Sequence, residues 1–506
     1  MVRGLLHRCA YFLTAVTWLT QYINSIYLLD IERRLSMAPW TRRLGTVMTS
    51  QRRAWRPALA VLVTLALGAT TAACGGDSDS ASSSGKTLTM WTFKQSHVKA
   101  LQKVAEGFQK ETGISVKVEA YGPDDAYVTK VQAAAQTKDL PDLFEVHTTG
   151  DDFAFGGAGL LTDLAKDVDD AWLNSYLPQV RKDGSVTDEY YQKSLAKDAK
   201  TKGIKLGQRY SVPLTVGTFG IVYANKQRLA DAGVTSAPTT WEQFIEVLGK
   251  VKAKHPDNGG VTIGFKSPTT GLEWFLQPMA YGLLGPEKFR GLWAKDKAGN
   301  FASPTGVQVL ETYGQVTPYW TPGTQSLDID SADMSFVQGK STFDIGGTFT
   351  LAFLAQNGFD AANVLTFPVP APSNGAIKDL SLAPFTLTGV SVSATTKNRA
   401  GAVQWLKYLA KADVSATFAK EALDVPPTDL GADPSAAVGP ALGAMIKAFG
   451  SGPNAYNPGD TSYRPNAYDG TPVAATLMDY TPLKTKSAAE TGAEMTKQID
   501  AYWTKQ

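Results

Sequence analysis

The segment from Lys86 to Tyr121 constrains the fold more than any other part of the chain. Residues 86–93 (KTLTMWTF) are rich in threonine and apolar side chains, as is typical of a strand. A helical repeat follows, and Gly113 suits its end; its apolar face consists of Leu101, Val104, Ala105 and Phe108. Residues 114–121 then alternate between apolar and polar side chains. A strand, a helix and a strand at this spacing predict two parallel strands with a right-handed crossover, and therefore an α/β fold.

The pattern continues with a second helix over 124–137 and a third strand over 143–146. In open α/β sheets, ligands bind at the carboxyl ends of the strands. Three segments should therefore face one cleft: Trp91–Phe93, Tyr121–Pro123 and His147–Gly150.

Composition and charge exclude several classes of function. The 506 residues, 43 % hydrophobic and 19 % charged, are enough for two or three soluble domains. Cys9 and Cys74 are the only cysteines and the four histidines are scattered, so we expect no disulfide framework, no metal site and no cofactor. The first 73 residues hold nine Lys/Arg and two acids, which leaves 40 Lys/Arg against 45 Asp/Glu, a net charge of −5, in the remainder. With no basic stripe there, we expect no nucleic-acid partner.

The segment before the first strand resembles a bacterial lipoprotein signal. Basic residues precede an uncharged stretch, Pro57–Ala73, that ends in small side chains and Cys74. The sequence Thr-Ala-Ala-Cys departs from the usual lipobox only in its first position, where leucine is usual. The resemblance implies that residues 48–73 are removed, that Cys74 is lipidated and that residues 74–85 form a flexible tether. The alternative is an ordinary cleaved signal with an incidental cysteine, and Gln51–Arg53 hints at twin-arginine export.

Residues 1–47 fit this scheme poorly. Residues 9–29 lack charge and could be interpreted as a membrane helix. However, Met48 stands where a signal peptide with a basic start would begin. We therefore expect translation to begin at Met48, with residues 1–47 a mis-annotated upstream segment.

Four sequence blocks occur in a recognisable order. The first is LTMWTF (88–93) with the helix and strand after it, and the second is LPDLFEVHTTGDDFAFGGAGLLTDL (140–164). The third is RYSVPLTVGTFGIVYANKQRLADAGVTSAPTTWEQF (209–244), and the fourth is the pair FDIGGTFTLAFL (343–354) and GVSVSATTKNRAGAVQWLKYLAK (389–411). Over residues 86–430 the chain resembles the extracellular solute-binding proteins of ABC transporters, in the sugar-binding group that includes maltose-binding protein. The family often has Gly-Pro-Trp where this chain has Gly347-Thr348-Phe349.

The resemblance implies a two-lobed periplasmic-binding-protein type II fold with three interlobe crossings. The crossings are expected at 212–226, 343–349 and 389–393. These would divide the chain into an N-terminal lobe (86–213 and 345–390) and a C-terminal lobe with a helical tail (214–344 and 391–506). The implied function is capture of a sugar or oligosaccharide by hinge closure, without catalysis, and delivery to membrane permease subunits. The chain has no phosphate-binding GxxxxGK[ST] loop, so the transport ATPase must be a separate protein. We expect a monomer, lipid-anchored at the extracellular face of the cytoplasmic membrane.

A sugar site needs flat aromatic rings and a few polar groups at their edges. Candidates are residues at strand ends, at the crossings, or in the segment 271–285, which resembles the family segment with a ligand-stacking tryptophan. Trp320, in the stretch TPYWTPG (317–323), is added as a residue that could line the cleft from the second lobe. The candidates are Trp91, Phe93, His147, Thr148, Asp151, Thr215, Trp274, Trp320, Thr348, Phe349, Thr388 and Gly389. Each could instead serve packing or capping, and Trp241, Trp405 and Tyr223 are expected in the core.

Two alternatives stay open at this point. The same fold could bind an oligopeptide, a polyamine or iron, with the adjacent Tyr190 and Tyr191 as iron ligands. A secreted glycosidase would need two carboxylates about 5–10 Å apart, for which Glu145, Asp151 and Glu273 are the nominees.

Overall fold

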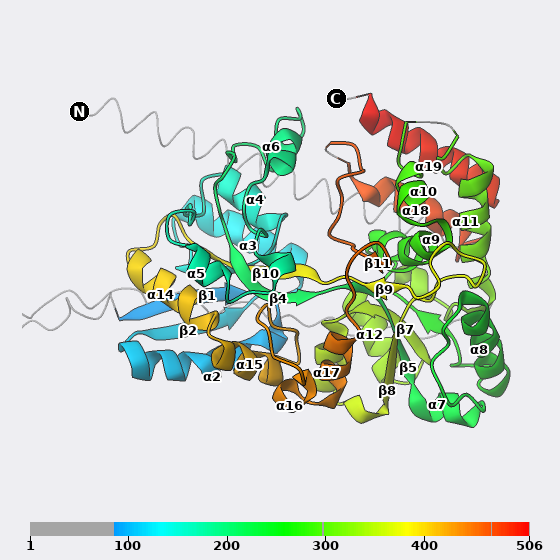
Figure 1. Ribbon diagram of the computed structural model, residues 1–506, viewed down its shortest axis with the longest axis horizontal. Coiled ribbons are helices and arrows are strands. Elements are labelled where there is room, and N and C mark those ends of the chain that lie inside the picture. The colour runs from blue at the N-terminus through cyan, green and yellow to red at the C-terminus, as the bar shows by residue number, and fades with distance from the viewer. Residues whose placement is uncertain (1–85, 296–297, 467, 505–506) are drawn as a thin grey trace, which may run out of the picture. The chain divides into compact units, whose positions relative to one another are not determined.

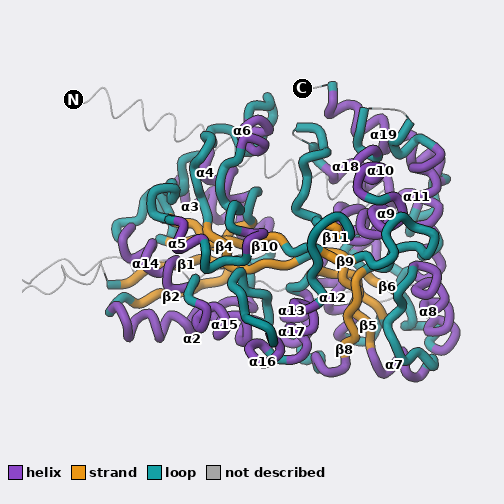
Figure 2. Tube along the Cα trace, in the orientation of Figure 1, coloured by secondary structure: helices purple, strands orange, loops and turns teal. Residues whose placement is uncertain are grey.

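The computed structural model describes residues 86–295, 298–466 and 468–504 (Figure 1). The upstream segment, the signal and the tether expected within residues 1–85 lie outside the described residues. Between Lys86 and Thr504 the chain forms two mixed sheets, each packed with helices (Figure 2). The expected two-lobed α/β fold is confirmed, with one sheet in each lobe.

The sheet of the first lobe has the strand order β2-β1-β3-β10-β4. β1 lies parallel to both β2 and β3, whereas β10 lies antiparallel to β3 and β4. The strands are β1 (Thr87–Thr92), β2 (Ser115–Ala120), β3 (Leu143–His147), β4 (Val212–Gly217) and β10 (Phe385–Val392).

The strand–helix–strand unit predicted from Lys86 to Tyr121 is confirmed. Helix α2 (Gln95–Thr112) packs against β2, and its apolar face, including Leu101 and Phe108, is fully buried. Gly113 ends the helix with φ 76°, a left-handed conformation that glycine adopts without a side-chain penalty. Helix α3 occupies Asp124–Thr137, as predicted.

The sheet of the second lobe has the strand order β6-β7-β5-β8. β5 lies antiparallel to β7 and β8, and β6 lies parallel to β7. Trp241 and Tyr223 are fully buried in this lobe and Trp405 in the first, so their expected place in the core is confirmed. The strands are β5 (Phe219–Asn225), β6 (Val261–Thr262), β7 (Phe343–Gly347) and β8 (Val364–Pro368).

Helices cover both sheets. The first lobe carries α2, α3, α4 (Asp151–Gly157), α5 (Asp170–Leu173), α6 (Asp188–Ser194), α14 (Arg399–Leu409) and α15 (Ala412–Ala422), followed by α16 (Pro434–Val438) and α17 (Pro440–Lys447). The second lobe carries α7 (Lys226–Asp231), α8 (Trp241–Lys254), the π-helical turn η2 (Gly271–Leu276), α9 (Gln277–Leu284), α10 (Pro286–Gly291), α11 (Pro304–Gly314), α12 (Ile329–Val337), α13 (Thr350–Gln356), α18 (Gly470–Tyr480) and α19 (Ala488–Trp503). A small parallel pair, β9 (Ser381–Leu382) and β11 (Ala455–Tyr456), joins the segments between them. None of the helices in the described part of the chain is long and apolar enough to cross a membrane.

Two of the three predicted crossings are misplaced. The chain passes from β4 to β5 at Thr218, inside the first predicted crossing. The second prediction, 343–349, is wrong because β7 pairs with β5 and β6 inside the second sheet. The third, 389–393, is wrong because these residues lie in or directly after β10 of the first sheet. The chain returns to the first sheet between β8 and β10 and leaves it again after α15.

The predicted lobe boundaries shift accordingly. β8 and α13, expected in the first lobe, belong to the second, since β8 pairs with β5 and α13 packs against α12. α14 and α15, expected in the second lobe, belong to the first, since both pack on α2. Hydrophobic strands of the two sheets have the same sequence pattern, so the pattern does not assign a strand to one sheet.

Candidate functional site

The ends of β1 and β3 bring several predicted site residues together. The ring of Phe93 stacks on the His147 ring at 4.4 Å between centroids. Trp91 packs edge-on against Tyr121 at 5.0 Å and against Phe144 at 6.5 Å. Lys130 places its ammonium 4.6 Å from the Trp91 ring. Trp91 and Phe93 are 9 % and 7 % exposed, so both rings are mainly covered by protein.

His147 is the more accessible member of this group. Its side chain is 44 % exposed, and Nδ1 lies 2.7 Å from Oδ2 of Asp151, the first residue of α4. The neighbouring Thr148 is buried, and its hydroxyl has no hydrogen-bond partner within the described structure. Position 147 therefore presents an imidazole held by a carboxylate.

Thr215 and Thr388 meet across β4 and β10. Their hydroxyls are hydrogen-bonded at 2.8 Å, and Thr388 is also in register with His147 on β3. Gly389 follows on β10, where a Cβ would come within 2.9 Å of Ser211, so no larger residue fits without a shift. These three residues lie in the interior of the first sheet, beside the point where β4 leaves for the second lobe.

Four rings form what we call the aromatic cluster: Phe219, Trp274, Phe349 and Phe385. Phe219 stacks on Trp274 at 4.9 Å with 16° between the ring planes, and it contacts Phe385 edge-on at 5.4 Å. Trp274 contacts Phe349 edge-on at 5.8 Å. Phe219 begins β5 and Phe385 begins β10, so the cluster spans two of the crossings. Of its members, Trp274 and Phe349 were predicted from the sequence.

Two predicted residues lie apart from these groups. Trp320 packs edge-on against Phe265 and Phe275, and its indole N–H donates to the Thr481 hydroxyl at 2.9 Å. Trp320 therefore packs inside the second lobe, which is the alternative role that the sequence left open for it. Thr348 is fully buried, and its hydroxyl has no hydrogen-bond partner within the described structure. This hydroxyl lies so close to Gly217 that a Cβ at position 217 would clash with it.

A cavity of about 280 Å³ adjoins the aromatic cluster through Phe385. It is bordered by the first lobe (Thr149, Gln179, Asp183 and Tyr190), by the approach to β10 (Ala383–Thr386) and by the segment around β11 (Gly450–Gly452, Ala455, Asn457 and Gly459). None of the twelve residues predicted to bind ligand lines it, although Thr149 is the neighbour of Thr148. The segment around β11 packs on α9 of the second lobe, so residues from both lobes border the cavity, which is the geometry that hinge closure requires.

The residues predicted to bind a sugar did not include Asp183, Tyr190 or Phe385. Burial raises the pKa of the Asp183 carboxyl, which accepts a hydrogen bond from the Thr386 backbone N–H at 3.1 Å. Burial also raises the pKa of Tyr190 to about 12, so its hydroxyl keeps its proton at neutral pH. The sequence indicated Tyr190 only as an iron ligand. Among the described residues, no three His, Cys, Asp or Glu side chains form a group that could hold a metal ion.

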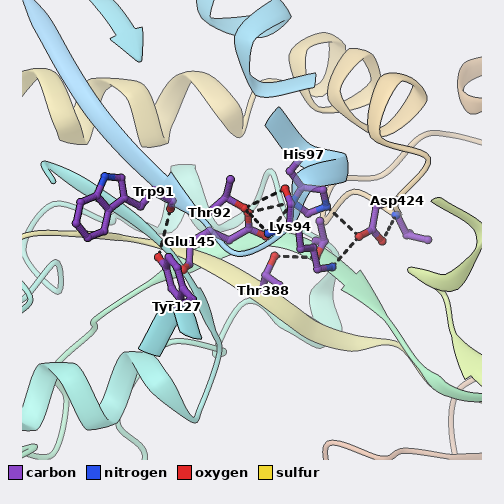
Figure 3. Close-up of polar contacts among 10 residues, drawn as sticks. Trp91, Thr92, Lys94, His97, Tyr127, Glu145, Thr388 and Asp424 are labelled. Carbon is purple, nitrogen blue, oxygen red and sulfur yellow. Dashed lines mark hydrogen bonds and ion pairs between the residues drawn. The ribbon is translucent and has the colours of Figure 1, made fainter. Parts of the chain in front are cut away.

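A cluster of buried charges lies behind the end of β1 (Figure 3). His97 has one ring nitrogen 2.9 Å from Glu145 and the other 3.1 Å from Asp424. Asp424 also accepts from the Lys94 ammonium at 3.0 Å, and Glu145 accepts from the Thr92 hydroxyl at 2.6 Å. We call Lys94, His97, Glu145 and Asp424 the buried charge cluster.

The protonation state of this cluster follows from its geometry. An imidazole with carboxylates at both nitrogens can donate to both only as the imidazolium. Burial alone lowers the pKa of His97, but the charge of Glu145 and the two hydrogen bonds outweigh it, so the pKa is raised. Burial likewise acts to raise the carboxyl pKa values, yet His97 and Lys94 lower that of Glu145 and bring that of Asp424 to about 2. Two cations and two anions therefore share the interior with no net charge.

The carboxylates nominated for a glycosidase are each engaged elsewhere. Glu145 pairs with His97, Asp151 with His147, and Glu273 with Arg464 at 2.8 Å. A retaining or inverting pair needs two carboxyl groups facing one bond. These three acids instead contact three separate basic side chains.

Comparison with known proteins decides the family. The model of the family described as bacterial extracellular solute-binding protein matches residues 94–416. The chain belongs to this family. Its members are extracellular binding proteins rather than enzymes, in agreement with the expected absence of catalysis.

Two relatives and one solved structure are similar to this solute-binding protein. It is 29 % identical over 193 residues to the diacetylchitobiose binding protein DasA of Streptomyces coelicolor, covering 36 % of this chain and 40 % of that one. It is 24 % identical over 372 residues to the maltodextrin-binding protein MdxE of Bacillus subtilis, covering 70 % and 76 %. The structure of a chitin oligosaccharide binding protein superimposes with a TM-score of 0.61 at 18 % identity, covering 82 % of this chain and 98 % of that chain. At 18 % identity this structural similarity shows the fold alone, which is the two-lobed fold of solute-binding proteins.

Proposed function

We propose that this solute-binding protein captures a sugar or oligosaccharide for an ABC importer, between the aromatic cluster and the adjoining cavity. The observation that carries the proposal is the cavity itself, because Tyr190 and Phe385 supply rings beside the polar side chains of Gln179, Asp183 and Asn457. Sugar rings present apolar C–H faces and a rim of hydroxyls, which such a lining matches. The names of two relatives, which bind diacetylchitobiose and maltodextrin, support the same class of ligand.

The charge of the residues that line the cavity restricts the class of ligand further. Asp183 is the only charged residue among those that border the cavity. The Asp183 carboxylate can accept hydrogen bonds from sugar hydroxyls. It would repel an anionic sugar, and no cationic side chain among the described residues lines the cavity to offset that repulsion. We therefore propose a neutral saccharide, with Trp274 and Phe349 of the aromatic cluster as stacking rings.

The test is a thermal-shift screen with N,N′-diacetylchitobiose, maltotriose and xylotriose, against glucuronic acid, spermidine and a tripeptide. A ligand at a hundred times its Kd stabilises the folded protein by about 2.7 kcal/mol. The expected result is a shift with one neutral saccharide and none with the other compounds. The variants Phe385→Ala and Trp274→Ala should weaken the shift, while Tyr319→Ala, outside the cavity lining, is the matched control.

Two outcomes would contradict the proposal. A shift with spermidine or the tripeptide alone would assign a non-sugar solute to the same fold. Release of a shortened product from any oligosaccharide, detected by mass spectrometry, would assign an enzyme.

We further propose that the protein is a monomer, attached to the extracellular face of the cytoplasmic membrane through lipid on Cys74, and that it delivers its ligand to permease subunits. The support is the family, whose members are extracellular, and the lipobox-like sequence Thr71–Cys74. Metabolic labelling with an alkyne fatty acid should tag the wild type and not Cys74→Ser, which should appear in the medium. Equal labelling of both would exclude this anchor.

A further inference from the structure

Lys94 lies at the boundary between the lobes. It precedes α2 in the first lobe, and its side chain is 15 % exposed. Its ammonium is 3.0 Å from Asp424 Oδ2 and 5.4 Å from the centroid of the Phe349 ring. Phe349 precedes α13 in the second lobe, and α13 also contacts α2. One ammonium thus bridges a carboxylate of one lobe and an aromatic face of the other.

The rest of the buried charge cluster fixes the position of that ammonium. Asp424 Oδ2 is held from one side by the His97 ring, and Asp424 Oδ1 accepts from the Val425 backbone N–H at 2.9 Å. His97 is in turn held by Glu145, which also accepts from Thr92. A lysine with four rotatable bonds would otherwise lose much entropy on ordering. Because Asp424 is already fixed, little reorganisation is needed for Lys94 to face Phe349.

We propose that Lys94 is an interlobe latch, for which Asp424 and His97 are positioning residues. Its contact with Phe349 stabilises the lobe arrangement described here and sets how often the lobes separate without ligand. The role in ligand capture rests on the proposed function, because Phe349 belongs to the aromatic cluster that would stack on the sugar. Apparent affinity scales with the populated fraction of the binding-competent arrangement, so the latch would tune it.

The test measures lobe arrangement without any ligand. Lys166 in the first lobe and Lys254 in the second are exposed and can each be changed to cysteine for spin labelling. The only native cysteines are Cys9 and Cys74, which are changed to serine in the full chain. Distances between the labels are then measured by double electron–electron resonance in the parent, Lys94→Met and Phe349→Leu.

The expected result is a distribution shifted toward separated lobes in both variants. A cation–π contact of ordinary strength corresponds to a change of roughly 2- to 30-fold in the population ratio. Combining Lys94→Met with Phe349→Leu should add little, because each change removes the same contact. Lys94→Arg, which keeps the charge for both Asp424 and the ring, should restore the parent distribution.

Lys130→Met is the matched control, because Lys130 lies 4.1 Å from the Tyr121 ring centroid within a single lobe. An unchanged distribution in Lys94→Met, additive effects in the double variant, or an equal shift in Lys130→Met would each overturn the latch. The thermal-shift screen with saccharides is carried out independently, on the parent chain. A latch without sugar binding would therefore refute only the proposed function, and sugar binding with no effect of Lys94→Met would refute only the latch.

Discussion

Replacing Asp424 by asparagine tests whether the buried charge cluster contributes to stability through charge. The variant keeps the size of the side chain and removes one of two anions, which leaves His97 and Lys94 facing a single carboxylate. Burial favours the neutral carboxyl, but Lys94 and His97 overcome it and lower the pKa of Asp424 from 3.8 to about 2. A carboxyl whose pKa is lowered this far contributes about 2 kcal/mol to the free energy of unfolding at neutral pH.

The sign of the pH dependence follows from the direction of that shift. A carboxyl whose pKa falls on folding adds stability above its unfolded pKa and loses it as the pH falls through the folded value. The contribution of Asp424 should therefore be complete at pH 7, about half present at pH 3, and absent near pH 1. His97 has the opposite sign, because its pKa is raised, so its contribution is complete below about 6.5 and falls at higher pH.

Urea unfolding of the wild type and Asp424→Asn at pH 7 and pH 3 is the assay. We expect the variant to lose about 2 kcal/mol at pH 7 and roughly half of that at pH 3. Asp433→Asn is the control, because Asp433 pairs with Lys447 at 2.9 Å on the surface, where water screens the pair and little change is expected. An equal loss at both pH values for Asp424→Asn would mean that packing, and not charge, explains the effect.

Three further changes probe other parts of the molecule. Gly217→Ala places a Cβ 1.9 Å from Thr348 Oγ1 at the end of β4, so it should destabilise by about 1–3 kcal/mol in urea, and adding Thr348→Ala should recover part of the loss. Leu101→Ala, at a fully buried position of α2, should cost about 2–5 kcal/mol by the same assay. Tyr190→Phe keeps the ring in the cavity wall and removes the hydroxyl, so calorimetry should show a saccharide Kd raised about 5- to 10-fold with unchanged stability; an unchanged Kd would remove Tyr190 from the site.

Local pattern was sufficient to predict the first half of the first lobe. The helical repeat that includes Leu101 and Phe108, the stop at Gly113 and the alternation over 114–121 are all short-range signals, and β1, α2, β2 and α3 follow them. The helical hydrophobic pattern of residues 402–423 predicts a single helix, but the chain forms α14 and α15, because Lys411 takes an extended conformation between them. A helical hydrophobic pattern continues across such a break, so it does not reveal the interruption.

The candidate site was harder to predict, because it is assembled from distant segments. Strand ends and the resemblance pointed to Trp274 and Phe349, which the structure places in one aromatic cluster. Asp183 and Tyr190 lie outside the strands, in a part of the first lobe whose sequence has no regular pattern, and they join Phe385 only through tertiary folding. His97 and Asp424 are 327 residues apart, and no local signal connects them.

Because His97 and Asp424 are so far apart in the sequence, their contact has to be specified by the side chains themselves, and charged groups specify it better than apolar ones. Asp424 follows α15 at the point where the chain runs beside β4, the strand that leads into the second lobe; the Val216 backbone N–H donates to the Val425 carbonyl at 2.9 Å. A shift of this segment by one residue would carry the Asp424 side chain away from Lys94 and His97. Such a slip would leave the buried Asp424 carboxylate without partners, at a cost of several kcal/mol, whereas His97 on α2 and Glu145 on β3 would still face each other. Leucines at the same positions would tolerate the slip, so the charges select one register at the junction of the two lobes.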